Sequence, residues 1–423
     1  MNRTKHVIAK MRVYSFLYYF TWSVTFILYT LWLSEVIGLN SVSIGTVFAV
    51  NGVFAVCAKP VYGYILDRSG MSKNILYFIG LISVAMAPFF IYIYKPLLIN
   101  YTPIGIVAGS IFLSLGWYAG VAANESYMDR ISRLYGTEFG RIRMLGSIGS
   151  TVGASVSGIL FNISPNINLV VSSATAAIML LILLSIKIDE TIIERTTVIS
   201  TEKIKPRDIA TLLQERKFWM FALYVAGVVW VMFVAEQQFP RFFVTFFKTK
   251  ELGNEWYGYM MTVKNGIEFF SMLTAPIIVN RLGAKNALIL CGILIGFRLI
   301  LCGLVHNYIA ISILKTLYGM EMALLLVSVF KYIADNFHAK FNATMYLLGY
   351  QTMVYVGSTI ISAPVGHFYD AYGFEQTYFF MGIFALTFTI ISYFTLSGKS
   401  YDEAERKHKP HQFNKTPIDV KAK

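Results

Sequence analysis

The sequence predicts an all-α membrane protein with twelve transmembrane helices in two pseudo-symmetric six-helix bundles. The first observation is composition: of 423 residues, 56% are hydrophobic and only 14% are charged, and the mean hydropathy is +0.59, far more apolar than a soluble domain. The second is that apolar runs of about 20 residues, each long enough to cross about 30 Å of hydrocarbon, recur between short polar breaks. The third is a loop motif that occurs once in each half.

Twelve apolar runs follow one another along the chain. We expect them to begin near Val13, Ile44, Asn74, Pro103, Met144, Leu169, Phe218, Tyr257, Ala287, Tyr308, Thr344 and Gln376. The longest polar interval comes after the sixth run. It divides the chain into an N-terminal six-helix bundle at residues 1–187, a cytoplasmic middle loop at 188–217, a C-terminal six-helix bundle at 218–398 and a cytoplasmic tail at 399–423.

The distribution of basic residues predicts the orientation of these spans. Lys and Arg precede the first run and follow the second, fourth and twelfth, whereas the intervening loops contain few. Short cytoplasmic loops carry the excess of positive charge, so both termini are expected to face the cytoplasm from the plasma (inner) membrane. The formal net charge of +13 is thereby explained as a topology signal, and it requires no nucleic-acid partner.

A short loop motif supports the division into halves. After the second run it comprises Gly63, Asp67, Arg68, Gly70 and Lys73. A degenerate copy follows the eighth run, at Asn280-Arg281-Leu-Gly283-Ala-Lys285-Asn286. In such a loop the Asp can accept bonds at a helix end and the Gly allows a tight turn. The alternative is a turn with surface charges, but two copies at matching places indicate a duplicated transporter fold, with this loop as a gating element.

The loop Gly-x-x-x-Asp-Arg-x-Gly-x-x-Lys resembles the signature of the major facilitator superfamily. Other stretches are similar to its oligosaccharide:proton symporters, and they include Ala87-Pro-Phe-Phe-Ile-Tyr-Ile-Tyr, Glu138-Phe-Gly-Arg-Ile-Arg-Met, Glu236-Gln-Gln-Phe, Leu314-Lys-Thr-Leu and Val329-Phe-Lys-Tyr-Ile. The resemblance covers nearly the whole chain, and the first span is most similar to sucrose-transporting members. It implies a monomeric permease that imports a disaccharide or small oligosaccharide with protons, without a cofactor.

Ionisable groups inside the predicted spans are candidates for function, because a charge in hydrocarbon is costly. The alternative for each is a structural ion pair or a side chain that reaches the interface. The candidates are Lys59, Glu125, Asp129, Arg143, Glu236, Arg241, Lys264, Glu268, Arg298, Lys315, Glu321 and Lys331.

The first half contains a polar stripe for substrate binding. Ser147 and Ser150 follow Arg143 at i+4 and i+7, on one helix face. The resemblance implies that Glu125 and Arg143 hold sugar hydroxyls, a task that suits a guanidinium fork and a carboxylate; the alternative is a buried pair joining the fourth and fifth spans. Ser150 replaces the Trp that stacks on the sugar in lactose-transporting members, which places a galactoside substrate in doubt. Trp22 is a candidate for the stacking aromatic.

The second half supplies the opposing pole. Asn265 lies where lactose-transporting members have an essential Glu, and Glu268 follows three residues later, as in sucrose-transporting members. Both positions share a helix face, so a carboxylate at either reaches the same cavity. Lys264 stands four residues before Glu268, so this pair is either an intrahelical salt bridge or a sugar contact. Tyr318 replaces a family His; a phenol forms hydrogen bonds but does not titrate near neutral pH.

The proton site is expected in the ninth and tenth spans. Six residues at about 100° each place Glu321 about 120° away from Lys315, so Lys315 is expected to pair with Glu236, as the family pattern also implies. Glu321 is left among apolar sequence neighbours, which favour its neutral form. By resemblance Glu321 is the coupling acid and Arg298 the cation whose approach promotes its deprotonation. The alternative is a neutral buried acid with a structural role.

Four further positions depart from lactose-transporting members. Phe233 and Val354 replace an oppositely charged pair, and losing both charges leaves no unpaired one. Lys59 and Arg241 are additional charges. The sequence offers no partner for Lys59, and Arg241 is expected to reach the outer interface.

The alternatives to a sugar symporter are an exporter or antiporter, a sugar sensor and an enzyme. An exporter or antiporter of another small molecule has the same fold, since fold does not fix the cargo. A sugar sensor that does not transport would use the tail from Lys399 as a partner site, although the tail lacks apolar periodicity. An enzyme is disfavoured, because the sequence contains no nucleophile and base pair, metal cluster or phosphate loop. The departures at 150 and 268 favour sucrose-like or other non-galactoside sugars.

Overall fold

The computed structural model describes residues 2–69, 72–137, 139–186, 211–338 and 341–398, and within them it contains helices and no strands. The helices of the first half, which ends at residue 186, are α1 (Asn2–Phe26), α2 (Tyr29–Leu31), η1 (Trp32–Val36), α3 (Ser41–Ser69), α4 (Asn74–Val84), α5 (Met86–Pro88), η2 (Phe89–Tyr94), α6 (Lys95–Asn100), α7 (Thr102–Leu113), η3 (Ser114–Tyr118), α8 (Gly120–Leu134), α9 (Phe139–Ile163) and α10 (Pro165–Ser185).

The second half begins at residue 211. Its helices are α13 (Arg216–Tyr224), η4 (Val225–Val229), α14 (Trp230–Gln237), α15 (Phe239–Val244), α16 (Lys250–Leu282), α17 (Ala284–Leu304), α18 (Tyr308–Asn336), α19 (Asn342–Thr344), η6 (Met345–Thr352), α20 (Met353–Tyr372) and α21 (Phe374–Thr395). The η elements are π-helical turns, which shift the hydrogen-bond ladder within a longer helix.

Joined end to end, these elements form twelve helical runs in the described residues, in agreement with the twelve predicted spans. Nine runs are long and apolar enough to cross a membrane, and α4 with the run Met86–Asn100, bent by 47°, would make a tenth. The other two, α16 and the run ending in α20, are more polar. In α16 this is because Glu255, Lys264 and Glu268 interrupt the apolar sequence, and these side chains contact protein partners.

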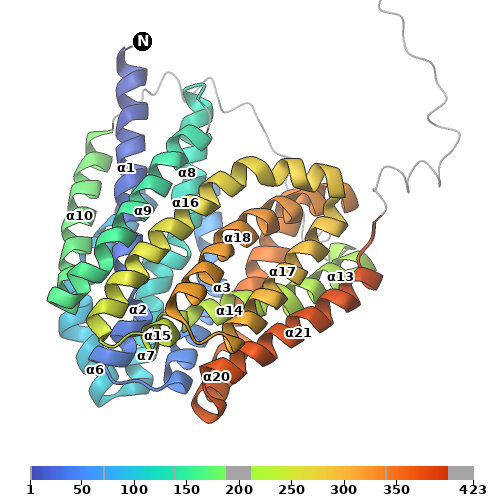
Figure 1. Ribbon diagram of the computed structural model, residues 1–423. Helices are drawn as coiled ribbons and strands as arrows, with labels where there is room; N and C mark the ends of the chain where they lie inside the picture. Colours follow the sequence, from blue (N-terminus) through green and yellow to red (C-terminus); the bar gives the residue numbers. More distant parts are fainter. Residues whose placement is uncertain (1, 70–71, 138, 187–210, 339–340, 399–423) are drawn as a thin grey trace, which may run out of the picture.

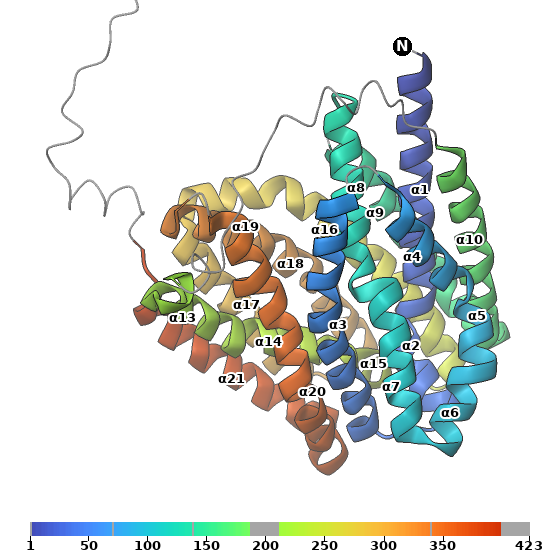
Figure 2. The same cartoon turned by 180° about the vertical axis from the view of Figure 1, so that it is seen from behind.

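The helices form two groups that meet along two helix pairs (Figures 1 and 2). In the first half α1 packs against α9 and α10, and in the second half α17 packs against α18 and α21. Between the halves, α3 packs against α20 and α9 against α16. Residues 188–210 of the expected middle loop and the expected tail at 399–423 lie outside the described residues.

The halves touch most closely at the face opposite the N-terminus, here called the closed face. A Cβ atom added at Gly45 of α3 would lie 2.2 Å from the carbonyl oxygen of Ser362, and one at Gly158 of α9 would lie 2.2 Å from that of Asn254. Such distances leave no room for a side chain, so glycine is required where these backbones meet. The closed face is thus a backbone-to-backbone contact between the halves.

Polar groups join the same face. The Asp370 carboxylate of α20 accepts from the backbone N–H groups of Ser41 (3.1 Å) and Val42 (3.0 Å). These N–H groups belong to the first turn of α3, where an anion offsets the unpaired donors and the helix dipole. Arg241 donates to the Ser41 hydroxyl at 2.7 Å, and Gln238 donates to the Ser41 carbonyl at 2.9 Å. Arg241, which the sequence places at the outer interface, therefore joins the two halves.

The loop motif lies at the other face, where α1 begins. Gly63, Asp67 and Arg68 belong to the end of α3, whereas Gly70 lies outside the described residues. The Lys73 ammonium donates to the carbonyl oxygens of Leu183 (3.0 Å) and Ile186 (2.6 Å). A cation at these last carbonyls of α10 satisfies orphan acceptors and the negative helix end.

Replacing Gly258 with Leu is expected to shift the protein away from the conformation with this closed face. A Cβ at Gly258 would lie 2.8 Å from the carbonyl oxygen of Ala154, so α9 and α16 must separate. The reporter is a cysteine that replaces Thr30, which is buried beneath the closed face, in detergent-solubilised protein that also carries Cys57→Ser. A bulky maleimide should label this cysteine about tenfold faster in the Gly258→Leu protein than in the protein that keeps Gly258. This corresponds to a shift of about 1.4 kcal/mol in the equilibrium between closed and open conformations. Gly266→Leu, on the same helix with no atom within 4 Å, is the control and should label at the original rate. Unchanged labelling of the Gly258→Leu protein would contradict the prediction.

Candidate functional site

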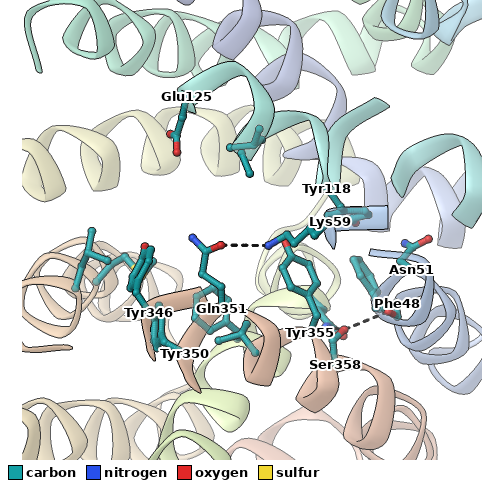
Figure 3. Close-up of a pocket in the computed structure, with 18 of the residues that line it drawn as sticks. Phe48, Asn51, Lys59, Tyr118, Glu125, Tyr346, Tyr350, Gln351, Tyr355 and Ser358 are labelled. Atoms are coloured by element: carbon teal, nitrogen blue, oxygen red, sulfur yellow. Dashed lines mark hydrogen bonds between the residues drawn. The ribbon is translucent and has the colours of Figure 1, made fainter. Parts of the chain in front are cut away.

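A cavity of about 510 Å³ lies between the halves (Figure 3), within the range of small-molecule sites. Seven of the nineteen lining residues are aromatic, and the wall also contains other apolar side chains and a few polar groups. The lining residues are Trp22, Phe48, Asn51, Gly52, Lys59, Tyr118, Val121, Ala122, Glu125, Phe233, Gln237, Met322, Leu326, Tyr346, Tyr350, Gln351, Val354, Tyr355 and Ser358.

Glu125 of α8 is the carboxylate in this wall. It accepts a hydrogen bond from the Tyr19 hydroxyl at 2.6 Å and from Arg143 Nε at 3.1 Å. Arg143 also donates to the Ser147 hydroxyl at 3.2 Å, and its guanidinium lies 3.8 Å from the centre of the Tyr19 ring. The structure thus brings Glu125, Arg143 and Ser147 together. The sequence does not identify Tyr19 as a site residue, because its position in an aromatic-rich first helix gives no signal that it faces α9.

Trp22 also lines the cavity, whereas Ser150 is outside its lining. The Trp22 ring stacks on Phe26, with centroids 4.4 Å apart, and meets the Trp117 and Tyr118 rings edge-on at 5.5 and 6.2 Å. The Ser150 backbone carbonyl accepts from the hydroxyl of Ser23. The aromatic surface near the polar pole is therefore supplied by α1 and η3.

The predicted opposing pole lies behind the cavity wall in this conformation. The Lys264 ammonium is 2.5 Å from a Glu268 oxygen and 3.4 Å from Asn265 Oδ1, so the intrahelical salt bridge exists. Asn265, Glu268 and Tyr318 are outside the lining of the cavity. The Tyr318 ring has three cations around it, Lys264, Lys315 and Arg298, at 5.2, 5.1 and 5.3 Å. The electron-rich ring face attracts cations and links the salt bridge to a second charged group.

That second group is a cluster of four charges on three helices. Lys315 of α18 contacts a carboxylate oxygen of Glu236 on α14. Arg298 of α17 lies 3.4 Å from Glu236 and donates from Nε to both oxygens of Glu321 at 2.9 Å. The side chains of Arg298 and Glu321 are each only 1% exposed. Two cations and two carboxylates make the cluster neutral, which buried ions require.

The sequence neighbours of Glu321 are apolar, but its carboxylate contacts Arg298, the cation that the family resemblance pairs with it. Residues adjacent to Glu321 in α18 point in other directions, and the face that carries Glu321 packs against α17. Which helix covers that face is a property of the tertiary packing.

The sequence offers no partner for Lys59, but the structure shows what it contacts. It lines the cavity from α3, its ammonium is 3.4 Å from Gln351 Oε1, and it lies 4.0 Å over the Tyr355 ring. Gln351 belongs to η6 and Tyr355 to α20, and neither carries a signal in the sequence. Phe233 and Val354, where a charged pair is absent, form part of the apolar wall.

Two helical halves around a central cavity, closed at one face and with ion pairs buried inside the spans, define a secondary transporter of the major facilitator type. Comparison with known proteins gives the family. The model of the LacY proton/sugar symporter family matches residues 1–408, and the chain belongs to this family.

Curated relatives are similar to this chain over nearly its whole length. The raffinose permease of Escherichia coli is 36% identical over 388 residues, 91% of each chain. The lactose permease of Klebsiella oxytoca is 36% identical over 89% of this chain and 91% of its own. The sucrose permease of Escherichia coli is 31% identical over 91% of this chain and 92% of its own. The sucrose-like pattern of the first span is therefore not matched by higher overall identity.

Solved structures share the fold at low identity. The nucleoside transporter NupG has a TM-score of 0.77 at 15% identity, over 92% of this chain and 98% of that chain. A D-xylose-proton symporter has a TM-score of 0.67 at 13% identity, over 93% of this chain and 98% of that chain. Together the fold and the family establish a multi-span sugar transporter, not an enzyme.

Lys315→Met is expected to destabilise the protein strongly. It leaves the buried cluster with two carboxylates and one cation, and removing one member of a buried pair costs about 3–5 kcal/mol. The double variant Lys315→Met with Glu236→Gln restores neutrality and should recover most of the loss. The measurement is the midpoint of thermal unfolding in detergent. Lys331→Met, which removes a lysine bonded to Asn280 outside the cluster, is the control and should cost less than about 0.5 kcal/mol. A double variant no more stable than Lys315→Met would count against the cluster acting as a unit.

Proposed function

We propose that this protein is a proton-coupled symporter that imports a disaccharide or small oligosaccharide by alternating access. The observation that carries the proposal is the neutral four-charge cluster, in which both carboxylates are next in sequence to residues of the cavity wall. Glu321 is followed by Met322 and Glu236 by Gln237, and both of these following residues line the cavity. A change of charge in the cluster therefore acts on helices that also contact the substrate. The relatives named for raffinose, lactose, melibiose and sucrose support an oligosaccharide as cargo.

In the proposed binding step, Glu125 and Arg143 bond to neighbouring sugar hydroxyls, because together they offer acceptors and donors in a fixed geometry. Trp22 supplies an apolar ring face, and Ser147 and Ser150 complete this pole. Asn265, Glu268 and Tyr318 form the opposing pole once the halves rearrange.

In the proposed coupling step, a proton binds Glu321 and releases Arg298, which keeps Glu236 as its partner. Loss of the proton re-forms the Arg298 pair. Tyr318 takes no part as a titrating group, since a phenol stays protonated near neutral pH. Coupling follows if sugar binds more tightly to the protonated form, because the two affinities are linked reciprocally.

The proposed orientation places both termini in the cytoplasm, with the halves at 1–187 and 218–398 moving as two bodies in a monomer. The closed face lies opposite the N-terminus, so in this orientation the cavity is shut toward the outside. The Lys73 loop lies at the cytoplasmic face, where the proposed gate opens.

Glu321→Gln is expected to abolish proton-driven accumulation while preserving sugar exchange. Gln keeps the shape of the carboxyl but carries no dissociable proton, so the cycle can exchange sugar at equilibrium but cannot couple to a gradient. Accumulation of radiolabelled sugar under an imposed proton gradient and sugar counterflow should both be measured in proteoliposomes. Glu375→Gln, at an exposed contact with His306, is the control and should accumulate normally.

Uphill accumulation by Glu321→Gln would contradict the coupling role. An exporter or antiporter would instead show accumulation when the proton gradient is reversed. A sensor would bind sugar without counterflow in the unmodified protein.

Glu125→Gln is expected to weaken sugar binding by about 10- to 100-fold. It removes a charged acceptor, and hydrogen bonds to charged groups contribute about 1.5–3 kcal/mol. The measurement is the sugar concentration at which the change in Trp22 fluorescence reaches half of its maximum. Asp129→Asn, one turn later on α8 in a solvent-exposed pair with Arg133, is the matched control. Equal affinity in the Glu125→Gln and Asp129→Asn proteins would exclude the contact.

A further inference from the structure

Lys59 is a charged residue in the cavity, and none of the described residues supplies a countercharge for it. The charged side chains in the cavity lining are Lys59 and Glu125. Glu125 is neutralised by Arg143 at 3.1 Å. Lys59 contacts an amide oxygen and an aromatic ring, and no described carboxylate lies within ion-pair distance of it.

The other charges close to the cavity balance one another. Lys264 pairs with Glu268, and the cluster of Arg298, Lys315, Glu236 and Glu321 is neutral. Among the described residues, and with Glu321 ionised, the cavity with its surrounding ion pairs therefore carries one net positive charge, on Lys59. A charge at this depth in a membrane protein is costly unless something offsets it, so its presence needs a reason.

Lys59 lines the cavity, and its ammonium points toward Gln351 on the opposite half (Figure 3). Lys59 lies about ten residues before the end of α3 and Glu125 about nine before the end of α8, so both lie about 15 Å from that end of their helix. An ammonium has three donors. Gln351 takes one, at 3.4 Å, and Tyr355 offers its ring face at 4.0 Å. Donor capacity therefore remains for a ligand.

We propose that the substrate is an acidic oligosaccharide whose carboxylate is bound by Lys59 beside Gln351 and Tyr355. This inference rests on the proposed function and names its substrate class. Glu125 and Arg143 bind hydroxyls of the same molecule, and the carboxylate supplies the missing countercharge. A single ammonium with neutral neighbours matches one negative charge. A phosphate carries more charge and is typically held by a guanidinium fork or several cations, which this part of the wall lacks among the described residues.

The proposal has an electrical consequence. One proton entering with one sugar carboxylate carries no net charge, whereas one proton entering with a neutral sugar carries one positive charge. Uptake of the acidic sugar should therefore not respond to membrane potential, and uptake of a neutral sugar should respond.

The test compares matched sugars in proteoliposomes of the full chain. The pairs are cellobiose with cellobiouronate and lactose with lactobionate, which place the carboxylate at opposite ends of the disaccharide. We expect at least one acid to be taken up about tenfold better than its neutral parent, without response to a potassium diffusion potential set by valinomycin.

Variants at Lys59 then test whether this residue causes the preference for the acidic sugar. Lys59→Met should lower the ratio of acidic to neutral uptake by about tenfold or more, and Lys59→Arg should retain it. Lys285→Met is the matched control, because Lys285 also lies over an aromatic ring, Tyr393 at 5.3 Å, but outside the cavity; it should retain the ratio. The thermal midpoint of each variant shows that it is folded, and removal of an unneutralised charge should leave Lys59→Met at least as stable as the parent.

Two results overturn the inference while leaving the proposed function intact: uptake of the neutral sugars without a preference for either acid, or a preference that Lys59→Met retains. Failure of the unmodified protein to transport any of the four sugars would count against both the inference and the proposed symport.

Discussion

The cost of an unneutralised charge in hydrocarbon is the constraint on which this structure depends. Charged side chains within the spans occur largely in pairs or clusters whose members lie on different helices. Glu125 and Arg143 join α8 to α9, and the four-charge cluster joins α14, α17 and α18. Because a broken buried pair costs several kcal/mol, the buried four-charge cluster fixes which faces of α14, α17 and α18 meet. The same groups are the ones that a transport cycle can use.

The contact between the halves is of another kind. At the closed face, glycines allow the backbones of α3 and α20, and of α9 and α16, to touch, and a few polar bonds such as that from Ser41 to Asp370 join the rim. The polar groups at the rim of this contact can bond to water when the halves part. A closure of this type can form and break repeatedly, as alternating access requires.

The cavity and the cluster share residues of the same two helices. Phe233 and Gln237 flank Glu236 on α14, and Met322 and Leu326 follow Glu321 on α18, and all four flanking residues line the cavity. In the proposed mechanism this adjacency allows one proton on Glu321 to alter the wall against which the sugar lies. Coupling then passes along two helices that each carry a cluster residue and cavity-lining residues.

The sequence by itself determined the helical membrane fold, the twelve runs, the duplicated loop and the family, because hydrocarbon thickness and the cost of charge leave their mark on local composition. It also indicated that Lys315 would meet Glu236, since helical periodicity separates Lys315 from Glu321. Only the tertiary structure decided that Arg298 contacts Glu236 as well as Glu321, that Tyr19 completes the Glu125 site, and that Lys59 faces Gln351 and Tyr355. These contacts join helices distant in sequence, and a helix face carries no local record of the helix that will cover it.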